Sequence, residues 1–128
     1  MPRTHPPHEL GRRGESVAVG YLLGRGWRLL ASNYRFGRRE VDLVVRRGDL
    51  VVFVEVKTRA GAGFGAPEEA VTRLKRREIE MVAEHWLERH RPGDVDVRFD
   101  VVSILVSPDG RLADVVHLED AWRPEASR

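Results

Sequence analysis

The stretch EVDLVVRRGDLVVFVEVKT, residues 40–58, decides the fold of this chain. It contains two runs rich in β-branched residues, 40–47 and 50–58, which are separated by the dipeptide Gly-Asp. A Gly-Asp pair between two such runs is typical of a β-hairpin with a two-residue turn. The second run is apolar on both faces until Glu55, which predicts a central strand that is covered on both sides.

A two-residue turn also sets the pairing of the two strands. With the turn at 48–49, Asp42 lies opposite Glu55 and Glu40 lies opposite Lys57. Directly opposite residues share a face of the sheet, with Cβ atoms about 5 Å apart. Glu55 and Lys57 share that face as well, about 6.5 Å apart along the strand, because side chains alternate. We therefore expect the carboxylates of Asp42 and Glu55 to meet beside the ammonium group of Lys57.

Hydrophobic patterns in the rest of the chain predict two helices and three further strands. One helix is expected over 9–24, and another ends at His90 and begins either at Pro67 or after Thr72 as its N-cap. Strands are expected at 27–34, 95–106 and 112–118. Together with the hairpin, these elements predict an α/β fold in the order αβββαββ.

The length of 128 residues indicates a single domain over 1–128. We expect order over about 9–122 and flexible tails at 1–8 and 123–128. Cysteine is absent, which excludes disulfides, thiolate metal sites, iron–sulfur clusters and cysteine nucleophiles. No apolar run approaches the roughly 18 residues of a membrane-spanning helix, and the first residues lack the apolar core of a secretory signal. We therefore expect a soluble, cytoplasmic protein.

The charge is unevenly distributed along the chain, although the net charge is only +2. Residues 1–50 carry 10 arginines, no lysine and 5 acidic residues, whereas residues 51–128 carry 12 basic and 15 acidic residues. An anionic partner is therefore expected at the amino-terminal part. The excess of arginine over lysine, 20 against 2, is compatible both with phosphate recognition and with a GC-rich genome.

The acidic patch on the hairpin has two interpretations. Like charges directly opposite one another destabilise a hairpin, and a buried carboxylate requires a proton or a cation. A hard divalent cation such as Mg²⁺, bound by one or two carboxylates and substrate phosphate, meets that requirement. In the alternative, the patch is a salt-bridged cluster in which Lys57 neutralises Glu55 and Glu40, and Arg59 neutralises Asp42. The apolar flanks of the patch favour the metal site.

Two residues on the expected helices are further candidates. Glu15 lies beside the apolar side of the first helix, either as a member of the site or as a capping or surface residue. Lys75 lies on the second helix, either as a contact to nucleic acid or as a lysine whose stem covers apolar surface. The segment AGAGFGA, residues 60–66, lacks the GK[ST] of a P-loop, so it is either a loop at the mouth of the site or an ordinary surface loop.

The sequence resembles the PD-(D/E)XK nuclease superfamily, in which a carboxylate on one strand is followed by a strand that ends in ExK. It is more similar still to the YraN-like family of uncharacterised bacterial proteins, which is related to archaeal Holliday-junction resolvases. The similarity extends over residues 11–102. The matching segments are GRRGE at 11–15 with Ala18, Tyr21 and Leu22; Gly26; NYR at 33–35; EVDLV at 40–44; VFVEVKTR at 52–59; Val71 with Lys75; and FDVV at 99–102.

This resemblance implies a restriction-endonuclease-like fold, with a central mixed sheet flanked by helices. It implies a Mg²⁺ or Mn²⁺ ion that is bound by Asp42, Glu55 and the backbone carbonyl of Val56. It also implies that Lys57 is the catalytic lysine and that Glu15 is a catalytic glutamate supplied by the first helix.

The function expected on this basis is metal-dependent endonuclease activity on DNA, with branched or damaged DNA as candidate substrates. The basic residues expected to bind phosphates are Arg12, Arg13, Arg35, Arg38, Arg39, Arg59 and Lys75. Arg39 departs from the family pattern, in which a glycine usually precedes the strand glutamate, and it adds positive charge near the site. Related resolvases act as dimers, so a homodimer is a further expectation.

Two other functions remain as alternatives at this point. One is a catalytically inactive nucleic-acid-binding protein with the same fold, and the other is a protein–protein adaptor that uses the helix face at Trp86 and Leu87. The opposed carboxylates speak against a pure binding protein, because such a protein has no need of them.

Overall fold

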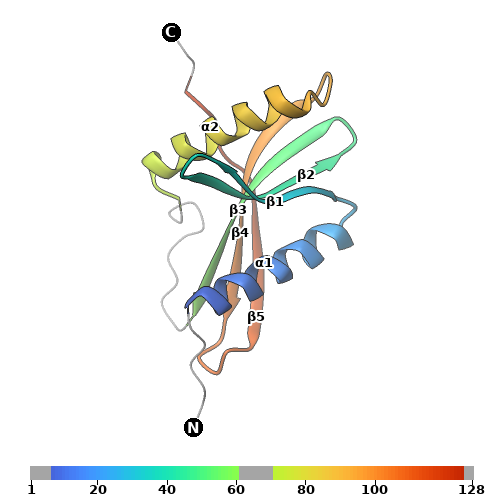
Figure 1. Cartoon of the computed structure of the whole chain (residues 1–128). Helices are drawn as coiled ribbons and strands as arrows, with labels where there is room; N and C mark the ends of the chain where they lie inside the picture. Colours follow the sequence, from blue (N-terminus) through green and yellow to red (C-terminus); the bar gives the residue numbers. More distant parts are fainter. Residues whose placement is uncertain (1–6, 61–70, 126–128) are drawn as a thin grey trace.

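A computed structural model describes residues 7–60 and 71–125 of the chain (Figure 1). Its helices and strands follow the predicted order αβββαββ. They are α1 (Pro7–Gly24), β1 (Arg28–Phe36), β2 (Arg39–Arg47), β3 (Leu50–Ala60), α2 (Arg73–His90), β4 (Asp96–Val106) and β5 (Leu112–Trp122). Within the described residues, none of the helices combines the length and the apolar character needed to cross a membrane.

The strands form one twisted sheet in the order β1-β2-β3-β4-β5. β3 is parallel to β4, and the other neighbouring pairs are antiparallel, so the sheet is mixed. The two helices lie on opposite sides of it (Figure 1). This α/β architecture is consistent with a restriction-endonuclease-like core, and it confirms the prediction that β3 is a central strand.

Each helix covers its own hydrophobic core. On one side, Ile79 and Trp86 of α2 pack with Phe53 of β3 and its buried neighbours. On the other side, Ala18 and Leu22 of α1 pack with a second group of buried aliphatic residues from β2, β3 and β4. The long apolar run of β3 supplies residues to both cores, which explains why both faces of this strand are apolar up to Glu55.

The β2–β3 hairpin has the predicted two-residue turn. Arg47 pairs with Leu50, and Gly48 adopts a φ of 60°, as a turn of this kind requires. The pairing continues with the predicted register as far as Leu43 and Val54, where the backbone pairing of the two strands ends. Beyond that point the two strands diverge (Figure 1).

This divergence corrects one prediction from the sequence. Glu40 does not lie opposite Lys57, because β2 leaves β3 before reaching that position. Glu40 is paired with Arg35 of β1 instead. The ends of β1 and β2 near their connecting turn, which we call the β1–β2 arm, therefore separate from the outer half of β3 like the two sides of a fork. The polar residues that were predicted to share one face of the hairpin are divided between this arm and β3.

A close contact positions α1 on the sheet. An added Cβ at Gly14 would lie only 1.8 Å from Oγ1 of Thr58 on β3. Only glycine leaves enough room for the helix to approach the strand at this point. The contact holds the first half of α1, including the neighbouring Glu15, against the outer half of β3.

The second helix begins in one of the two ways that its sequence allowed. Thr72 is the N-cap, and its Oγ1 accepts a hydrogen bond from the backbone N–H of Lys75 at 3.2 Å. Residues 61–70 lie outside the described residues, together with Pro67 and most of the glycine-rich segment, so neither the earlier helix start nor the loop is described.

The remaining element boundaries differ from the predictions by a few residues. α1 already begins at Pro7, because proline is compatible with the first turn of a helix. β5 extends to Trp122 rather than 118, since an irregularity in the β4–β5 ladder allows Phe99 to pair with Trp122.

Candidate metal centre

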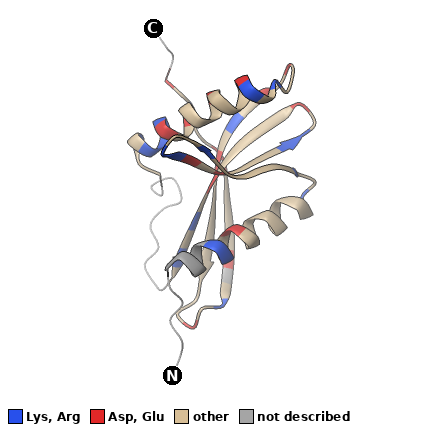
Figure 2. Ribbon diagram, in the orientation of Figure 1, with Lys and Arg blue, Asp and Glu red and all other residues tan. Residues whose placement is uncertain are grey.

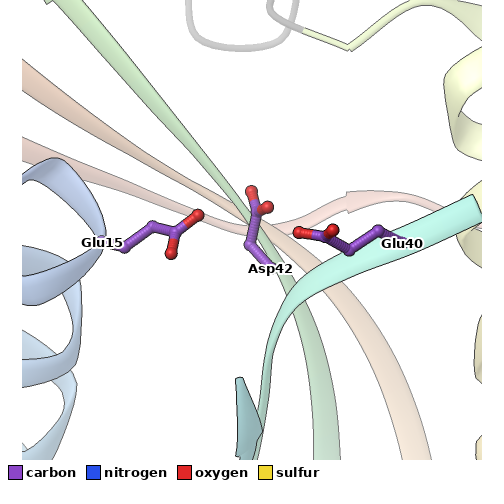
Figure 3. Close-up of side chains that lie close together, drawn as sticks. All are labelled: Glu15, Glu40 and Asp42. Carbon is purple, nitrogen blue, oxygen red and sulfur yellow. The ribbon is translucent and has the colours of Figure 1, made fainter. Parts of the chain in front are cut away.

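Three carboxylates converge where α1 meets the β1–β2 arm. Glu15 of α1 and Glu40 and Asp42 of β2 each offer an oxygen atom, and these three atoms lie within 4.8 Å of one another. Figure 3 shows Glu15 and Glu40 pointing toward Asp42 from opposite sides. All three side chains are half-buried. We call this group the acidic cluster.

Glu40 is a member of the acidic cluster that was missed in the sequence. Its signal was present, because Glu40 and Asp42 are two residues apart on one strand and therefore share a face. Only the salt-bridge interpretation gave Glu40 a role, as a partner of Lys57. In the structure its Oε2 accepts a hydrogen bond from Nε of Arg35 at 3.0 Å, while Oε1 is directed to the cluster side.

Asp42 is fixed in place by the backbone of β3. Its Oδ2 accepts a hydrogen bond of 2.7 Å from the N–H of Val56. Burial raises the pKa of Asp42 above the ordinary value, the Val56 hydrogen bond opposes this effect, and the charge of Glu40 adds to it. The Val56 N–H thus reaches Asp42, whereas the predicted role of the Val56 carbonyl as a metal ligand stays a prediction.

Glu55 lies deeper in the molecule, next to Asp42. It is only 4% exposed, and its Oε2 has no hydrogen-bond partner among the described residues. Burial, followed by the charge of Asp42, raises the pKa of Glu55 to about 8. The structure therefore brings the predicted pair close together, and Glu55 adjoins the acidic cluster without being one of its three members. Its role as a metal ligand stays a prediction.

Two lysines supply positive charge to these carboxylates. Nζ of Lys57 lies 3.8 Å from Oε1 of Glu55, which is the ion pair that the salt-bridge interpretation expected. Lys75 approaches from α2, and its charge lowers the pKa of both Asp42 and Glu55. The charge of Lys75 therefore acts on both carboxylates of the predicted pair.

Asn33 of β1 is the other residue that the sequence-based prediction did not assign to the site. Its side-chain Nδ2 lies 3.2 Å from both carboxylate oxygens of Glu15 and 2.9 Å from Oε1 of Glu40. The backbone of Asn33 has a positive φ of 50°. A single amide thus bridges two members of the acidic cluster that come from different elements.

Glu15 is held in the cluster by packing as well as by this amide. The Gly14–Thr58 contact sets the position of its helix. Burial raises the pKa of Glu15, the hydrogen bond from Asn33 lowers it, and the charges of Asp42 and Glu40 raise it further. Glu15 thus belongs to the cluster rather than to the open surface.

The arginines predicted to bind phosphate surround the acidic cluster rather than entering it. Figure 2 shows basic residues on α1, directly after its grey segment, and along the β1–β2 arm. Arg12, Arg13 and Arg38 are exposed, and Arg35 is exposed but hydrogen-bonded to Glu40. The two remaining arginines of the predicted set, Arg39 and Arg59, are half-buried.

The carboxylates of the acidic cluster meet the requirements of a hard cation. Oxygen ligands at about 2.1 Å from one Mg²⁺ ion lie at most about 4.2 Å apart. The cluster oxygens, which lie within 4.8 Å of one another, therefore reach this spacing with at most a small movement of flexible side chains. Carboxylate oxygens are the ligands that Mg²⁺ and Mn²⁺ prefer, so the residues present fit such an ion.

Comparison with known proteins places this chain among bacterial relatives. A UPF0102 protein of Geobacter sulfurreducens is 47% identical over 120 residues, which cover 93% of this chain and 92% of the relative. UPF0102 proteins of Prosthecochloris aestuarii and Dictyoglomus thermophilum are 43% and 39% identical, over 93% and 89% of this chain and 97% of each relative. The model of the uncharacterised protein family UPF0102 matches residues 14–104, a range that includes the acidic cluster, Glu55 and both lysines. The chain therefore belongs to the UPF0102 family.

Proposed function

We propose that this protein is a metal-dependent endonuclease that acts on DNA. The observation that carries the proposal is the acidic cluster of Glu15, Glu40 and Asp42 beside the unpaired, buried Oε2 of Glu55. Carboxylates at this spacing repel one another, and a buried oxygen without a partner is costly. A divalent cation relieves both costs at once.

In this proposal Asp42 and Glu55 hold the ion, and Glu15 and Glu40 supply further carboxylate oxygens from the acidic cluster. A bound Mg²⁺ or Mn²⁺ ion supplies Lewis acidity and lowers the pKa of a bound water. Lys57 is the residue that stabilises the negative charge developing on the phosphate during cleavage. Its ion pair with Glu55 keeps the ammonium group at the site before a substrate arrives.

The DNA partner is supported by the charges around the site. The exposed arginines of α1 and of the β1–β2 arm lie on both sides of the acidic cluster (Figure 2). A duplex held by such residues is bound through its phosphates, which positions the scissile bond without reading the bases. Phe36 is 40% exposed on the same arm and stacks on His85 with ring centroids 4.2 Å apart, so an aromatic surface lies next to this basic region.

One observation favours a second function, a non-catalytic nucleic-acid-binding protein. Lys57 is already paired with Glu55, and the charge of Lys75 acts on Asp42 and Glu55. These contacts neutralise part of the site without a metal. The same arginines would then hold DNA that is never cut.

A nuclease assay separates these functions. The purified protein is incubated with linear, nicked, flapped and four-way DNA, with Mg²⁺, with Mn²⁺ and with a chelator. We expect metal-dependent cleavage that is lost in Asp42→Asn and retained in the control Asp94→Asn, an exposed aspartate just before β4. Salt-sensitive DNA binding without cleavage of any substrate would favour the binding protein and would contradict the endonuclease.

A further inference from the structure

The backbone of Asn33 interrupts the β1–β2 ladder, which keeps one register from Ala31 to Phe36. Its neighbours Ser32 and Tyr34 pair with Leu43 and Val41, a register that would place Asn33 opposite Asp42. Asn33 instead has a φ of 50°, in the left-handed region that non-glycine residues seldom adopt. Asparagine is among the few residues that tolerate this conformation, so the deviation is permitted by the residue type at this position.

The consequence is an amide placed among the carboxylates. Nδ2 of Asn33 contacts both oxygens of Glu15 and Oε1 of Glu40. The other oxygen of Glu40 is already engaged by Arg35, so Asn33 occupies the position that faces the cluster. An amide hydrogen carries partial positive charge, and here it offsets part of the repulsion that a cation would otherwise offset.

An asparagine side chain can present either end of its amide at one place. Carboxylates are acceptors only, so without a cation the amide must present its NH₂ group to Glu15 and Glu40. A cation can be approached only by an acceptor, which is the carbonyl oxygen of the same amide. Rotation of the amide about its last side-chain torsion exchanges these two groups while the backbone stays in place.

A second observation is that a buried carboxylate oxygen beside the cluster lacks a hydrogen-bond partner. Oε2 of Glu55 is buried and has no hydrogen-bond partner among the described residues, although the neighbouring Asp42 accepts a hydrogen bond from the N–H of Val56. Glu15, Glu40 and Asp42 each accept at least one hydrogen bond, whereas Oε2 of the adjoining Glu55 accepts none among the described residues. The amide of Asn33 donates hydrogen bonds to Glu15 and Glu40 and leaves Oε2 of Glu55 without a donor.

We propose that Asn33 is a positioning residue with two states. Without a metal ion its NH₂ group links Glu15 to Glu40 and holds the acidic cluster together. With a divalent cation the amide turns and directs Oδ1 to the ion, as an additional neutral oxygen ligand. This inference rests on the metal site of the proposed function.

The test uses the full chain without DNA, so that its readouts do not depend on cleavage. Mg²⁺ and Mn²⁺ binding is measured by calorimetry, and thermal melts are recorded with and without Mg²⁺, for the wild type, Asn33→Gly and Asn33→Asp. Glycine removes the amide but accepts the positive φ, so Asn33→Gly separates the amide from the backbone conformation. Aspartate keeps an acceptor but cannot donate.

We expect Asn33→Gly to bind the ion about tenfold more weakly, which is within the range for residues that support a metal site. Its melting temperature without metal should fall, because Glu15 and Glu40 lose their link. Asn33→Asp should melt lower still without metal, since a fourth carboxylate joins the cluster, but it should bind the ion at least as tightly as the wild type. Equal affinities in all three proteins would overturn the inference.

The side-chain amide of Asn33 gives a readout in the wild type itself, which serves if a variant fails to fold. Its ¹⁵N–¹H signals are assigned and followed during a Mg²⁺ titration. We expect them to move and to exchange faster with solvent once the bonds to the carboxylates are released. Signals that stay in place while calorimetry shows Mg²⁺ binding would overturn the role of Asn33 alone. A wild type that binds neither ion would overturn both this role and the proposed metal site.

Discussion

Oδ2 of Asp42 accepts a 2.7 Å hydrogen bond from the backbone N–H of Val56, beyond the point where the ladder between β2 and β3 ends. This single bond links the two strands across the fork and orients the Asp42 carboxylate without any metal. The acidic cluster is thereby positioned by the backbone of a central strand. A metal ion bound as proposed would therefore meet an Asp42 carboxylate that the backbone of β3 has already oriented.

The link between Asp42 and Val56 leads to different outcomes for two substitutions. Asp42→Asn keeps an oxygen that can accept the Val56 bond and removes one negative charge, so metal-free stability should be close to that of the wild type. Asp42→Ala leaves the N–H without a partner, which costs about 1–3 kcal/mol. Urea unfolding with a chelator measures the difference, and equal losses in the two variants would show that the bond does not contribute.

The raised pKa of Glu55 predicts a dependence of stability on pH. A pKa of about 8 in the folded protein means that Glu55 retains a proton through the range where an unfolded glutamate, with a pKa near 4.5, has lost it. The folded state then binds more protons than the unfolded state, so metal-free stability should fall as pH rises from about 4.5 to about 8.

The Glu55→Gln variant provides the control for this pH dependence. It cannot ionise, so the decline in stability over this range should be smaller in the variant than in the wild type. Saturating Mg²⁺ should also reduce the decline, because an ion stabilises the ionised carboxylates. Denaturant unfolding at a series of pH values measures both effects, and parallel curves for the wild type and Glu55→Gln would contradict the assignment.

The packing of α1 on β3 predicts opposite effects for two glycine substitutions. Gly14→Ala places a methyl group against Oγ1 of Thr58, and such overpacking typically costs about 1–3 kcal/mol. Gly20→Ala is the matched control in the same helix, since an added Cβ there has nothing within 4 Å, and it should stabilise by about 0.5–1 kcal/mol.

The same contact connects packing to the metal site. Moving α1 away from β3 also moves Glu15 away from Asp42, so Gly14→Ala should weaken Mg²⁺ binding whereas Gly20→Ala should not. Adding Thr58→Ala to Gly14→Ala removes the obstructing hydroxyl and should restore part of both losses. Calorimetry on these variants would contradict the relationship if Gly14→Ala bound Mg²⁺ as tightly as Gly20→Ala.

Lys57 is expected to act on catalysis more than on DNA binding. Lys57→Ala should lower the cleavage rate by about 10²–10³, because the ammonium group stabilises charge that develops only in the transition state. Its DNA affinity should remain close to that of the wild type. The variant also removes the cation beside Glu55, so metal-free stability should fall above pH 8, where Glu55 is ionised, and added Mg²⁺ should restore much of it. Cleavage at the wild-type rate would remove Lys57 from the mechanism.

The arginines around the acidic cluster predict binding that depends on salt. The logarithm of DNA affinity should fall with the logarithm of the salt concentration, with a slope of about −0.9 for each phosphate contacted. Arg13→Ala should reduce this slope, whereas the control Arg111→Ala, in the turn between β4 and β5, should leave it unchanged. Affinity that is the same at low and at physiological salt would exclude these arginines as the DNA contact.

The local parts of this protein could be predicted from the sequence. The Gly-Asp turn sets the β2–β3 register, because a two-residue turn leaves only one parity of pairing. Asp42 and Glu55 follow directly where this ladder ends, and they lie close enough to act on one another's pKa. The alternation of side chains places Glu55 and Lys57 on one face, where they form their ion pair. Each of these relationships depends on residues that are close in sequence or joined by one turn.

The acidic cluster itself was decided by the tertiary structure. On the amino-terminal side of Leu43, β2 no longer pairs with β3. Glu40 is therefore directed away from Lys57 and toward Asn33 and Arg35 of β1. Glu15 joins only because the absence of a Cβ at Gly14 lets α1 approach β3 closely. Strand divergence and helix approach arise from packing between distant segments, and neither leaves a periodic signal in the sequence of one element.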